Sequence, residues 1–195
     1  TVAYDPVELR SYVYDTIAIL LASGLDPSKS ILFRQSDVSA HTEMCWLLGS
    51  VCAHGDLNRM HQFKDKSAGQ QKLVSAGLFS YPVLQAADIL LYKTTEVPVG
   101  EDQKQHIELA KDIAERFNHR YGEVLVVPSL VVPEVGAKIK DLQHPENKMS
   151  TSSGSDSGRI YILDNEETIS KKIRTSVTDC GHDILVAPDK EGALS

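Results

Sequence analysis

Residues that could bind a small molecule concentrate between positions 81 and 103. Tyr81, Gln85 and Asp88 are four and three residues apart, which places them on one face of an expected helix. Most of their neighbours are apolar, so this face is expected to lie inside the protein. A carboxylate in such a place needs a hydrogen-bonding partner or a ligand, because its desolvation is costly. The pattern therefore predicts a small-molecule site.

A second polar group stands at the end of this stretch. Residues 97–100, Val-Pro-Val-Gly, are expected to form a short strand and a turn, followed by a helix over residues 101–121. The helix opens with Glu101, Asp102 and Gln103. A polar triplet beside a strand-to-helix turn is suited to holding the same small molecule.

Two loop-like segments carry lysine and hydroxyl side chains. Residues 62–69 contain Lys64 and Lys66, and their composition suits either a solvated loop or an anion-binding loop for a polyphosphate. Residues 148–152, KMSTS, suit a surface loop as well as a site. The sequence has no phosphate loop, nucleophile elbow or zinc-type histidine pair, and His106 is expected to pack rather than to catalyse.

Alternating strand and helix patterns predict an α/β fold, a parallel sheet covered by helices. Asp5 and Pro6 are typical of a helix start and Gly24 of its end, and the apolar residues between them are expected to point into a core. Strands are expected at 31–33, 97–99 and 124–127, with a further extended piece at 135–139. Other helices are expected over residues 41–53, 56–60 and 165–177.

The composition is that of a soluble globular protein of 195 residues, with 42% apolar and 24% charged residues. A net charge of −7 argues against non-specific coating of nucleic acid. No apolar run approaches the roughly 20 residues of a membrane helix, so no membrane partner is expected. Three cysteines without metal-ligand spacing indicate reduced thiols and a cytoplasmic protein without a protein-bound metal.

The amino-acid sequences of several segments resemble those of the bacterial tryptophan–tRNA ligases, which are class I aminoacyl-tRNA synthetases. The matching segments are AYDPVELR, SDVSAHTEMCWLL, FKDKSAG, SAGLFSYPVLQAADILLY, VPVGEDQKQHIELAKDIAERFN, KMSTS and KKIRTSVTD. The resemblance covers nearly the whole chain. It implies a Rossmann-like catalytic core over residues 1–142, then a KMSKS-type loop and the beginning of a helical domain over residues 143–195.

The resemblance implies a pocket for L-tryptophan around Asp88, which would accept a hydrogen bond from the indole N–H. A substrate without that donor would leave the acceptor unpaired. Tyr81 and Gln103 match family positions that contact the amino acid, and Val97 and Val99 match residues that line the indole pocket. Gln85 lies on the same helix face, at a position where the family varies.

The resemblance also implies an ATP site. Gly100 would let the backbone approach the nucleotide, and the acids beside it, Glu101 and Asp102, would hold the ribose hydroxyls. Ile139 would pack near adenine, and Lys66 would reach the pyrophosphate with Lys64 as a helper. The KMSKS loop corresponds to Lys148, Met149, Ser150, Thr151 and Ser152, of which Lys148, Ser150 and Ser152, together with Lys66, are the expected catalytic residues.

The implied reaction joins tryptophan to ATP, releases pyrophosphate and passes the tryptophanyl group to tRNA(Trp). No protein nucleophile is needed, because positioning and charge stabilisation by lysines and Mg²⁺ suffice. The family is dimeric, and a homodimer with the apolar segment 44–51 near its interface is expected. The resemblance begins after the family's HIGH motif and ends before most of its helical domain, so residues 1–195 alone are expected to charge no tRNA.

Three alternatives stay open. A tyrosine–tRNA ligase also uses a glutamine and an aspartate on the equivalent helix, which makes Gln85 and Asp88 ambiguous, although the VPVGEDQ wording favours tryptophan. A non-catalytic paralogue that senses tryptophan or regulates RNA would fit the acidic balance. A structural interaction domain on a retained fold is the third alternative.

Thr151 stands where many members of the family carry a second lysine. Its neutral side chain removes a positive charge on the pyrophosphate side, where one electrostatic contact is worth about 3 kcal/mol. We expect Thr151→Lys to accelerate adenylate formation in single-turnover measurements. An unchanged activation rate would contradict this expectation.

Overall fold

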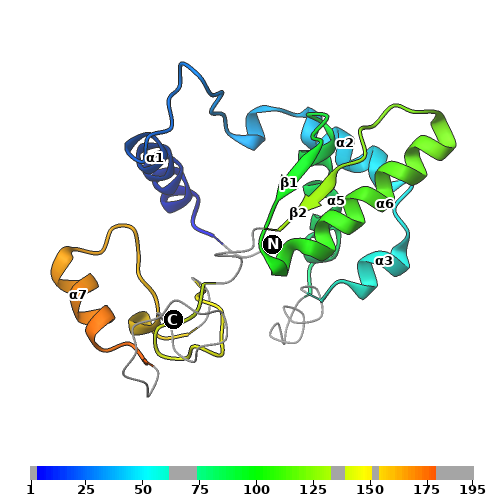
Figure 1. Cartoon of the computed structure of the whole chain (residues 1–195). Helices are drawn as coiled ribbons and strands as arrows, with labels where there is room; N and C mark the ends of the chain where they lie inside the picture. Colours follow the sequence, from blue (N-terminus) through cyan, green and yellow to red (C-terminus); the bar gives the residue numbers. More distant parts are fainter. Residues whose placement is uncertain (1–3, 62–73, 133–138, 151–153, 179–195) are drawn as a thin grey trace. The chain divides into compact units, whose positions relative to one another are not determined.

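The computed structural model describes residues 4–61, 74–132, 139–150 and 154–178. Figure 1 shows its elements, in which η marks a 3-10 helix. In chain order they are α1 (Pro6–Ala22), η1 (Gln35–Asp37), α2 (Ala40–Gly49), α3 (His54–Arg59), α5 (Ala76–Leu90), β1 (Glu96–Pro98), η2 (Glu101–Gln103), α6 (Lys104–Tyr121), β2 (Ser129–Val131), η3 (Asp156–Gly158) and α7 (Glu166–Arg174). The chain forms two compact units, residues 1–98 with 102–131, and residues 99–101 with 132–195. The predicted boundary at residue 142 stays a prediction.

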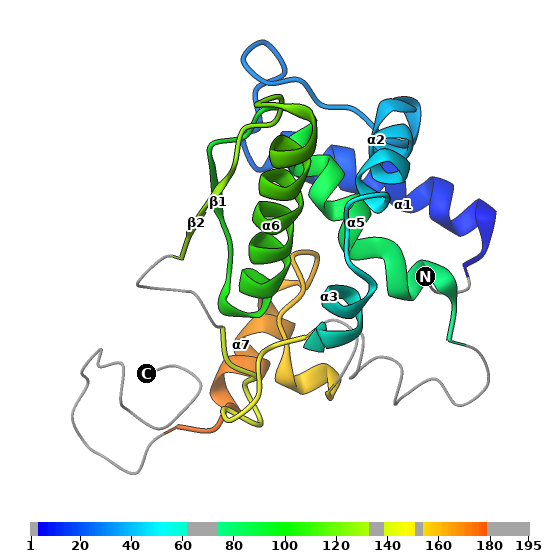
Figure 2. The same ribbon diagram turned by 90° about the vertical axis from the view of Figure 1, so that its right-hand side faces the viewer.

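The first unit contains a parallel strand pair joined by a helix. β1 and β2 pair in parallel with Val97 opposite Leu130, and α6 lies along them as the crossover helix (Figure 2). Parallel pairing needs such a crossover, because a tight turn cannot return the chain in the same direction. The predicted α/β class with a parallel sheet is therefore confirmed.

The predicted strand at 124–127 was misplaced: the second strand begins at Ser129. The side chain of Asn118 explains the shift. Its Oδ1 accepts hydrogen bonds from the backbone N–H groups of Val124 (3.1 Å) and Leu125 (2.8 Å), and its Nδ2 donates to the Leu125 carbonyl (2.7 Å). These backbone groups are thus satisfied by a side chain instead of a neighbouring strand.

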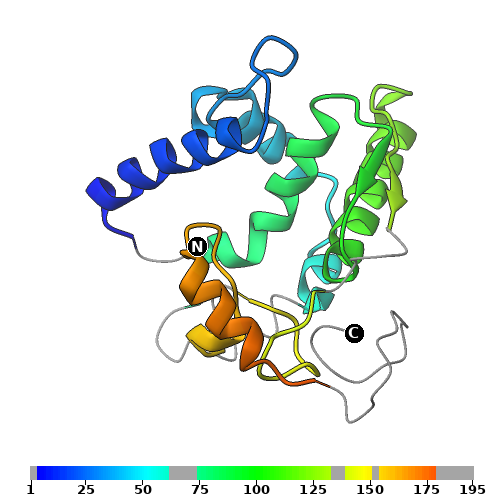
Figure 3. The ribbon, with the colours of Figure 1, turned by 60° about the vertical axis from the view of Figure 1, so that its left-hand side comes forward.

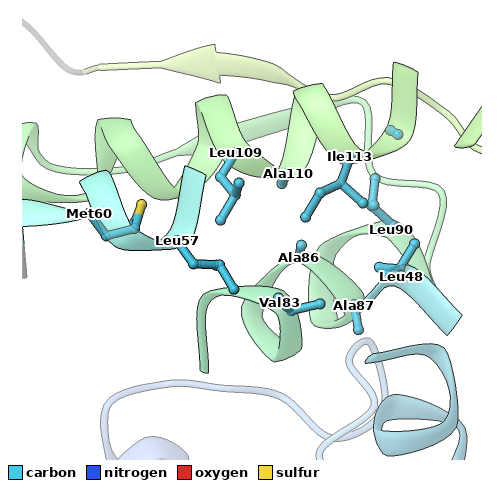
Figure 4. Close-up of a cluster of buried hydrophobic side chains, with 11 residues drawn as sticks. Leu48, Leu57, Met60, Val83, Ala86, Ala87, Leu90, Leu109, Ala110 and Ile113 are labelled. Atoms are coloured by element: carbon cyan, nitrogen blue, oxygen red, sulfur yellow. The ribbon is translucent and has the colours of Figure 1, made fainter. Parts of the chain in front are cut away.

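The core of this unit lies where α5 packs against α6 and α2 (Figure 4). Small side chains face one another there and let the helix axes approach closely. Four alanines, Ala86, Ala87, Ala110 and Ala114, are fully buried. Around them stand the larger buried residues Leu48, Leu57, Met60, Val83, Leu90, Leu109 and Ile113.

The predicted helix start at Asp5 is confirmed. The Asp5 carboxylate accepts hydrogen bonds from the N–H groups of Val7 (2.8 Å) and Glu8 (3.0 Å), and Pro6 occupies the first helical position. The expectation that the apolar residues of α1 enter a core was wrong, because none of its residues is buried.

The strand expected at 31–33 does not form in the part of the chain that the structure describes. Ile31 is 91% exposed, and residues 31–34 carry no regular structure. A strand depends on a neighbour to pair its N–H and C=O groups, and no described strand lies beside this segment. The extended piece expected at 135–139 falls largely outside the described residues.

The second unit is built from loops and α7, drawn yellow to orange in Figure 3. Asn165 caps α7 by accepting a hydrogen bond from Thr168 N–H (2.8 Å). A buried ion pair joins Lys172 of α7 to Asp164 (2.8 Å), and the same ammonium lies 4.9 Å from the centroid of the Tyr161 ring. The hydrogen bond from Lys172 holds the pKa of Asp164 below its usual value.

Among the described residues, no helix is both long enough and apolar enough to cross a membrane.

The close approach of α5 and α6 predicts that Ala110→Leu overpacks the core. We expect a loss of about 1–3 kcal/mol in the free energy of unfolding, measured by urea titration. The matched control is Glu108→Leu, which adds the same side chain at an exposed position of α6. Equal stability of the two variants would contradict the proposed packing constraint.

Candidate functional site

Helix α5 carries the first three predicted site residues. Ser75 caps its start by accepting a hydrogen bond from Leu78 N–H (3.1 Å), and the apolar residues that follow bury one side of the helix. Tyr81, Gln85 and Asp88 lie along the helix at half-buried positions. The prediction that these residues share one face of a helix is confirmed, although that face is half-buried instead of fully buried.

The carboxylate of Asp88 has the hydrogen-bonding partners that its partial burial requires. Gln35 Nε2 lies 2.8 Å from Oδ1 and 2.7 Å from Oδ2, and His41 Nδ1 lies 2.6 Å from Oδ1. The Asp88 side chain nevertheless keeps 35% of its surface exposed. It can therefore accept a further hydrogen bond from a ligand, because a carboxylate offers about four lone-pair sites.

His41 was not among the predicted site residues. It lies in the first turn of α2, is 4% exposed, and places its Nε2 2.8 Å from the Tyr92 hydroxyl. The rings of Phe33 and Tyr92 lie 6.0 and 5.5 Å from its ring and shield it from solvent. The only sequence signal was a histidine close to a predicted helix start.

Gln35 was also missed, because it belongs to the short turn η1, which has no periodic pattern. Close to this cluster, the Cys45 thiol is half-buried on α2. Its burial, and secondarily the charge of Asp88, raise the pKa of Cys45. The surroundings of Asp88 thus include this thiol as well as its two hydrogen-bonding partners.

Tyr81 is held by a buried histidine of α6. Its hydroxyl lies 2.9 Å from His106 Nε2, and the two rings are 5.5 Å apart. His106 is 2% exposed, which confirms the prediction that it packs and hydrogen-bonds. Burial raises the pKa of the Tyr81 hydroxyl.

Amide side chains connect α5 to the start of α6. Gln85 Nε2 donates to Gln103 Oε1 (3.3 Å), and Gln103 Nε2 donates to Asp102 Oδ2 (2.9 Å). The structure therefore brings these three predicted residues together within the first unit. Val97 is half-buried in the centre of β1.

Several other predicted residues belong to the second unit. Val99 and Gly100 are half-buried, and Glu101 is exposed. Ile139 lies next to the KMSTS segment, because the Met149 N–H donates a hydrogen bond to the Ile139 carbonyl (2.8 Å). Lys140 and Lys148 form an isolated antiparallel β-bridge.

Arg159 binds backbone carbonyls of the KMSTS segment and of the residues that follow it. Its guanidinium donates to Ser150 O (2.9 Å), Gly154 O (2.9 Å) and Ser155 O (3.3 Å). A planar guanidinium suits this task, because its donors point in fixed directions. Sequence reasoning missed Arg159, since an isolated arginine in a loop carries no pattern.

Asp141 supports the same region from below the surface. It is 4% exposed, and its Oδ1 accepts hydrogen bonds from Gln143 N–H (2.9 Å) and His144 N–H (3.0 Å). A Cβ atom added to Gly158 would clash with the Asp141 carboxylate, which would have to leave its present position.

Four predicted residues, Lys64, Lys66, Thr151 and Ser152, lie outside the described residues. Within the described part of the chain, no group of three histidine, cysteine or acidic side chains is placed to hold a metal ion. The first unit thus offers a carboxylate acceptor beside a tyrosine and linked amides, and the second offers a supported loop with a lysine and a hydroxyl. Such groups have the chemistry to bind and position a polar ligand.

Known proteins resemble this chain in sequence and fold. The family described as "tRNA synthetases class I (W and Y)" matches residues 3–189. The tryptophan–tRNA ligase of Caldanaerobacter subterraneus is 50% identical over all 195 residues, and that of Halalkalibacterium halodurans is 50% identical over 98% of the chain. The chain spans 59% and 57% of these two relatives.

Solved structures agree. Tryptophanyl-tRNA synthetase from Mycoplasma pneumoniae has a TM-score of 0.92 at 40% identity over 99% of this chain and 57% of its own. The enzyme from Campylobacter jejuni, complexed with ADP and tryptophane, has a TM-score of 0.77 at 41% identity over 92% of this chain and 54% of its own. With a family match over nearly its whole length, the chain belongs to the class I tRNA synthetases of the tryptophan and tyrosine group.

Proposed function

We propose that the natural polypeptide containing residues 1–195 activates L-tryptophan with ATP and transfers it to tRNA(Trp). The observation that carries this proposal is the Asp88 carboxylate, held on α5 by Gln35 and His41 with part of its surface still exposed. Relatives that are 50% identical and bear the name tryptophan–tRNA ligase support it.

Asp88 would select the amino acid through the indole N–H. A site built to satisfy a buried acceptor rejects an analogue without the donor strongly, since the acceptor is then left unpaired. Tyr81 would offer its hydroxyl to the amino acid, and Gln103 with Gln85 would hold its polar end. Val97 and Val99 would contact the indole ring.

ATP would be bound by the residues that match the family's nucleotide-binding positions. Gly100, Glu101 and Asp102 would approach the ribose, and Ile139 and Met149 would contact the adenine region. Lys148, Ser150, Thr151, Ser152 and Lys66 would serve the phosphates. Mg²⁺ enters as MgATP, since this ion prefers phosphate oxygens and water as ligands.

In the proposed first step, a carboxylate oxygen of tryptophan forms a bond to the α-phosphorus of ATP. The bond from that phosphorus to the bridging β-oxygen breaks, and pyrophosphate leaves with the electron pair. Protein groups position the two substrates and stabilise the developing charge on pyrophosphate, a contribution that reaches several kcal/mol. In the second step, a terminal ribose hydroxyl of tRNA takes the tryptophanyl group, and AMP leaves.

We propose a homodimer in the cytoplasm for the natural polypeptide. Two apolar residues of α2, Trp46 and Leu47, are 84% and 51% exposed, and such residues suit a protein interface. Cys45 and Cys52 are free thiols, which suits a reducing compartment. A monomeric mass in solution would exclude the dimer.

Tyrosine is the rival substrate, because the matched family includes both specificities. A non-catalytic paralogue is the rival of a different class. Tryptophan-dependent exchange of labelled pyrophosphate into ATP separates it from an enzyme, since a sensor would show no exchange.

The acceptor role of Asp88 predicts that Asp88→Ala weakens tryptophan binding by about tenfold to a hundredfold in calorimetric titration of the natural polypeptide. Tyrosine should bind the unsubstituted protein much more weakly than tryptophan. Asp112→Asn is the control, because it removes a carboxylate at an exposed position of α6. Unchanged tryptophan affinity in Asp88→Ala, or tighter binding of tyrosine, would refute the proposed specificity.

The contacts of Arg159 predict a selective effect on the nucleotide step. Arg159→Gln should lower kcat/KM for ATP in pyrophosphate exchange by about tenfold or more, because small displacements of binding groups reduce catalysis strongly. Tryptophan affinity should stay within twofold. The matched control is Arg174→Gln, which removes the same positive charge at the exposed end of α7. Equal exchange rates in the two variants would show that Arg159 does not position the loop.

A further inference from the structure

A chain of three polar side chains crosses from α2 to the end of α5. The Tyr92 hydroxyl lies 2.8 Å from His41 Nε2, and His41 Nδ1 lies 2.6 Å from Asp88 Oδ1. Tyr92 is 51% exposed, His41 is 4% exposed, and the Asp88 side chain is 35% exposed. The histidine is therefore the enclosed link between two groups that reach solvent.

The direction of the hydrogen bonds follows from the carboxylate. An ionised carboxylate only accepts, so Nδ1 of His41 carries the proton and donates to Asp88. In the neutral imidazole, Nε2 is then the acceptor and the Tyr92 hydroxyl donates to it. Because both ring nitrogens are engaged, the ring has one orientation, and its Nδ1–H always points at the same carboxylate oxygen.

The two donors to Asp88 differ in how firmly they are held. Gln35 is exposed and comes from the short turn η1, so its amide can leave when a ligand supplies another donor. His41 is enclosed by the rings of Phe33 and Tyr92 and cannot leave in the same way. Of the two, His41 is thus the donor that fixes the carboxylate plane.

We propose that His41 is a positioning residue for substrate selection: its Nδ1–H orients the Asp88 carboxylate toward a ligand N–H donor. This inference rests on the proposed function, in which the donor is the indole N–H. His41 does not touch the substrate in this scheme. It sets how strongly the site separates tryptophan from an isostere without the N–H.

Two amide substitutions separate this role from simple packing. His41→Asn places an N–H close to the position of Nδ1 and keeps a donor for Asp88. His41→Gln is nearer in volume to histidine, but its amide reaches toward the position of Nε2 and Tyr92. A positioning role requires the asparagine variant to perform better, and a packing role requires the glutamine variant to perform better.

The experiment measures dissociation constants of the natural polypeptide and both variants for two ligands. One is L-tryptophan, and the other is β-(1-benzothiophen-3-yl)-L-alanine, in which sulfur replaces the indole N–H. The readout is the dissociation constant for the benzothiophene analogue divided by that for tryptophan, which is high when the site selects tryptophan. We expect His41→Gln to reduce this ratio about tenfold and His41→Asn to keep it within threefold of the unsubstituted protein.

Equal ratios in the two variants, or a lower ratio in His41→Asn, would overturn the proposal. If the unsubstituted protein does not bind tryptophan or does not separate the two ligands, the proposed function fails. If it separates them and His41→Gln does so equally well, only the role of His41 fails.

A second measurement needs no substitution and therefore cannot be lost to misfolding. The Nδ1–H proton of His41 should give a low-field resonance in the proton NMR spectrum, because it donates to a carboxylate at short distance. Tryptophan should shift this resonance and the benzothiophene analogue should shift it much less. A resonance that responds equally to both ligands would also overturn the proposal.

Discussion

The partial burial of one carboxylate, Asp88, is the constraint on which the arrangement of the first unit depends. A desolvated charge needs donors, and the helix that bears it cannot supply them, because its own N–H groups are engaged within the helix. They come from η1 and the start of α2, 53 and 47 residues earlier in the chain. The packing of α2 against α5 thus brings a hydrogen-bond donor to the Asp88 carboxylate and also forms part of the apolar core.

Helix α6 joins the core to the polar groups. Its buried alanines allow α5 to approach closely, and this approach brings His106 to the Tyr81 hydroxyl and Gln103 to Gln85. At the other end of α6, Asn118 binds the backbone of the segment that leads into β2. One helix therefore sets both the strand pair and the spacing of the site residues.

Sequence reasoning succeeded where a pattern is local. The helix starts at Asp5 and Asn165 depend on local residue type, and the shared face of Tyr81 and Asp88 depends on local spacing; the structure confirms them. It failed where one side chain elsewhere in the chain determines the local structure. Asn118, for example, binds the backbone of residues 124 and 125, where a strand was predicted. For the same reason it missed Gln35, His41 and Arg159, whose contacts join segments that no periodicity relates. The roles assigned to the nucleotide-binding residues came from family resemblance and stay proposals.

The chemical nature of the donors around Asp88 has a consequence for selectivity. A lysine or arginine at the place of His41 would neutralise the carboxylate and weaken its attraction for a further donor. Gln35 and His41 satisfy part of the carboxylate through single N–H donors, and part of its surface stays open to a further donor. Hydrogen bonds to an ionised acceptor are about twice as strong as those between neutral groups. A site held in this way can therefore distinguish an N–H from an isosteric sulfur, which an apolar pocket of the same shape cannot do.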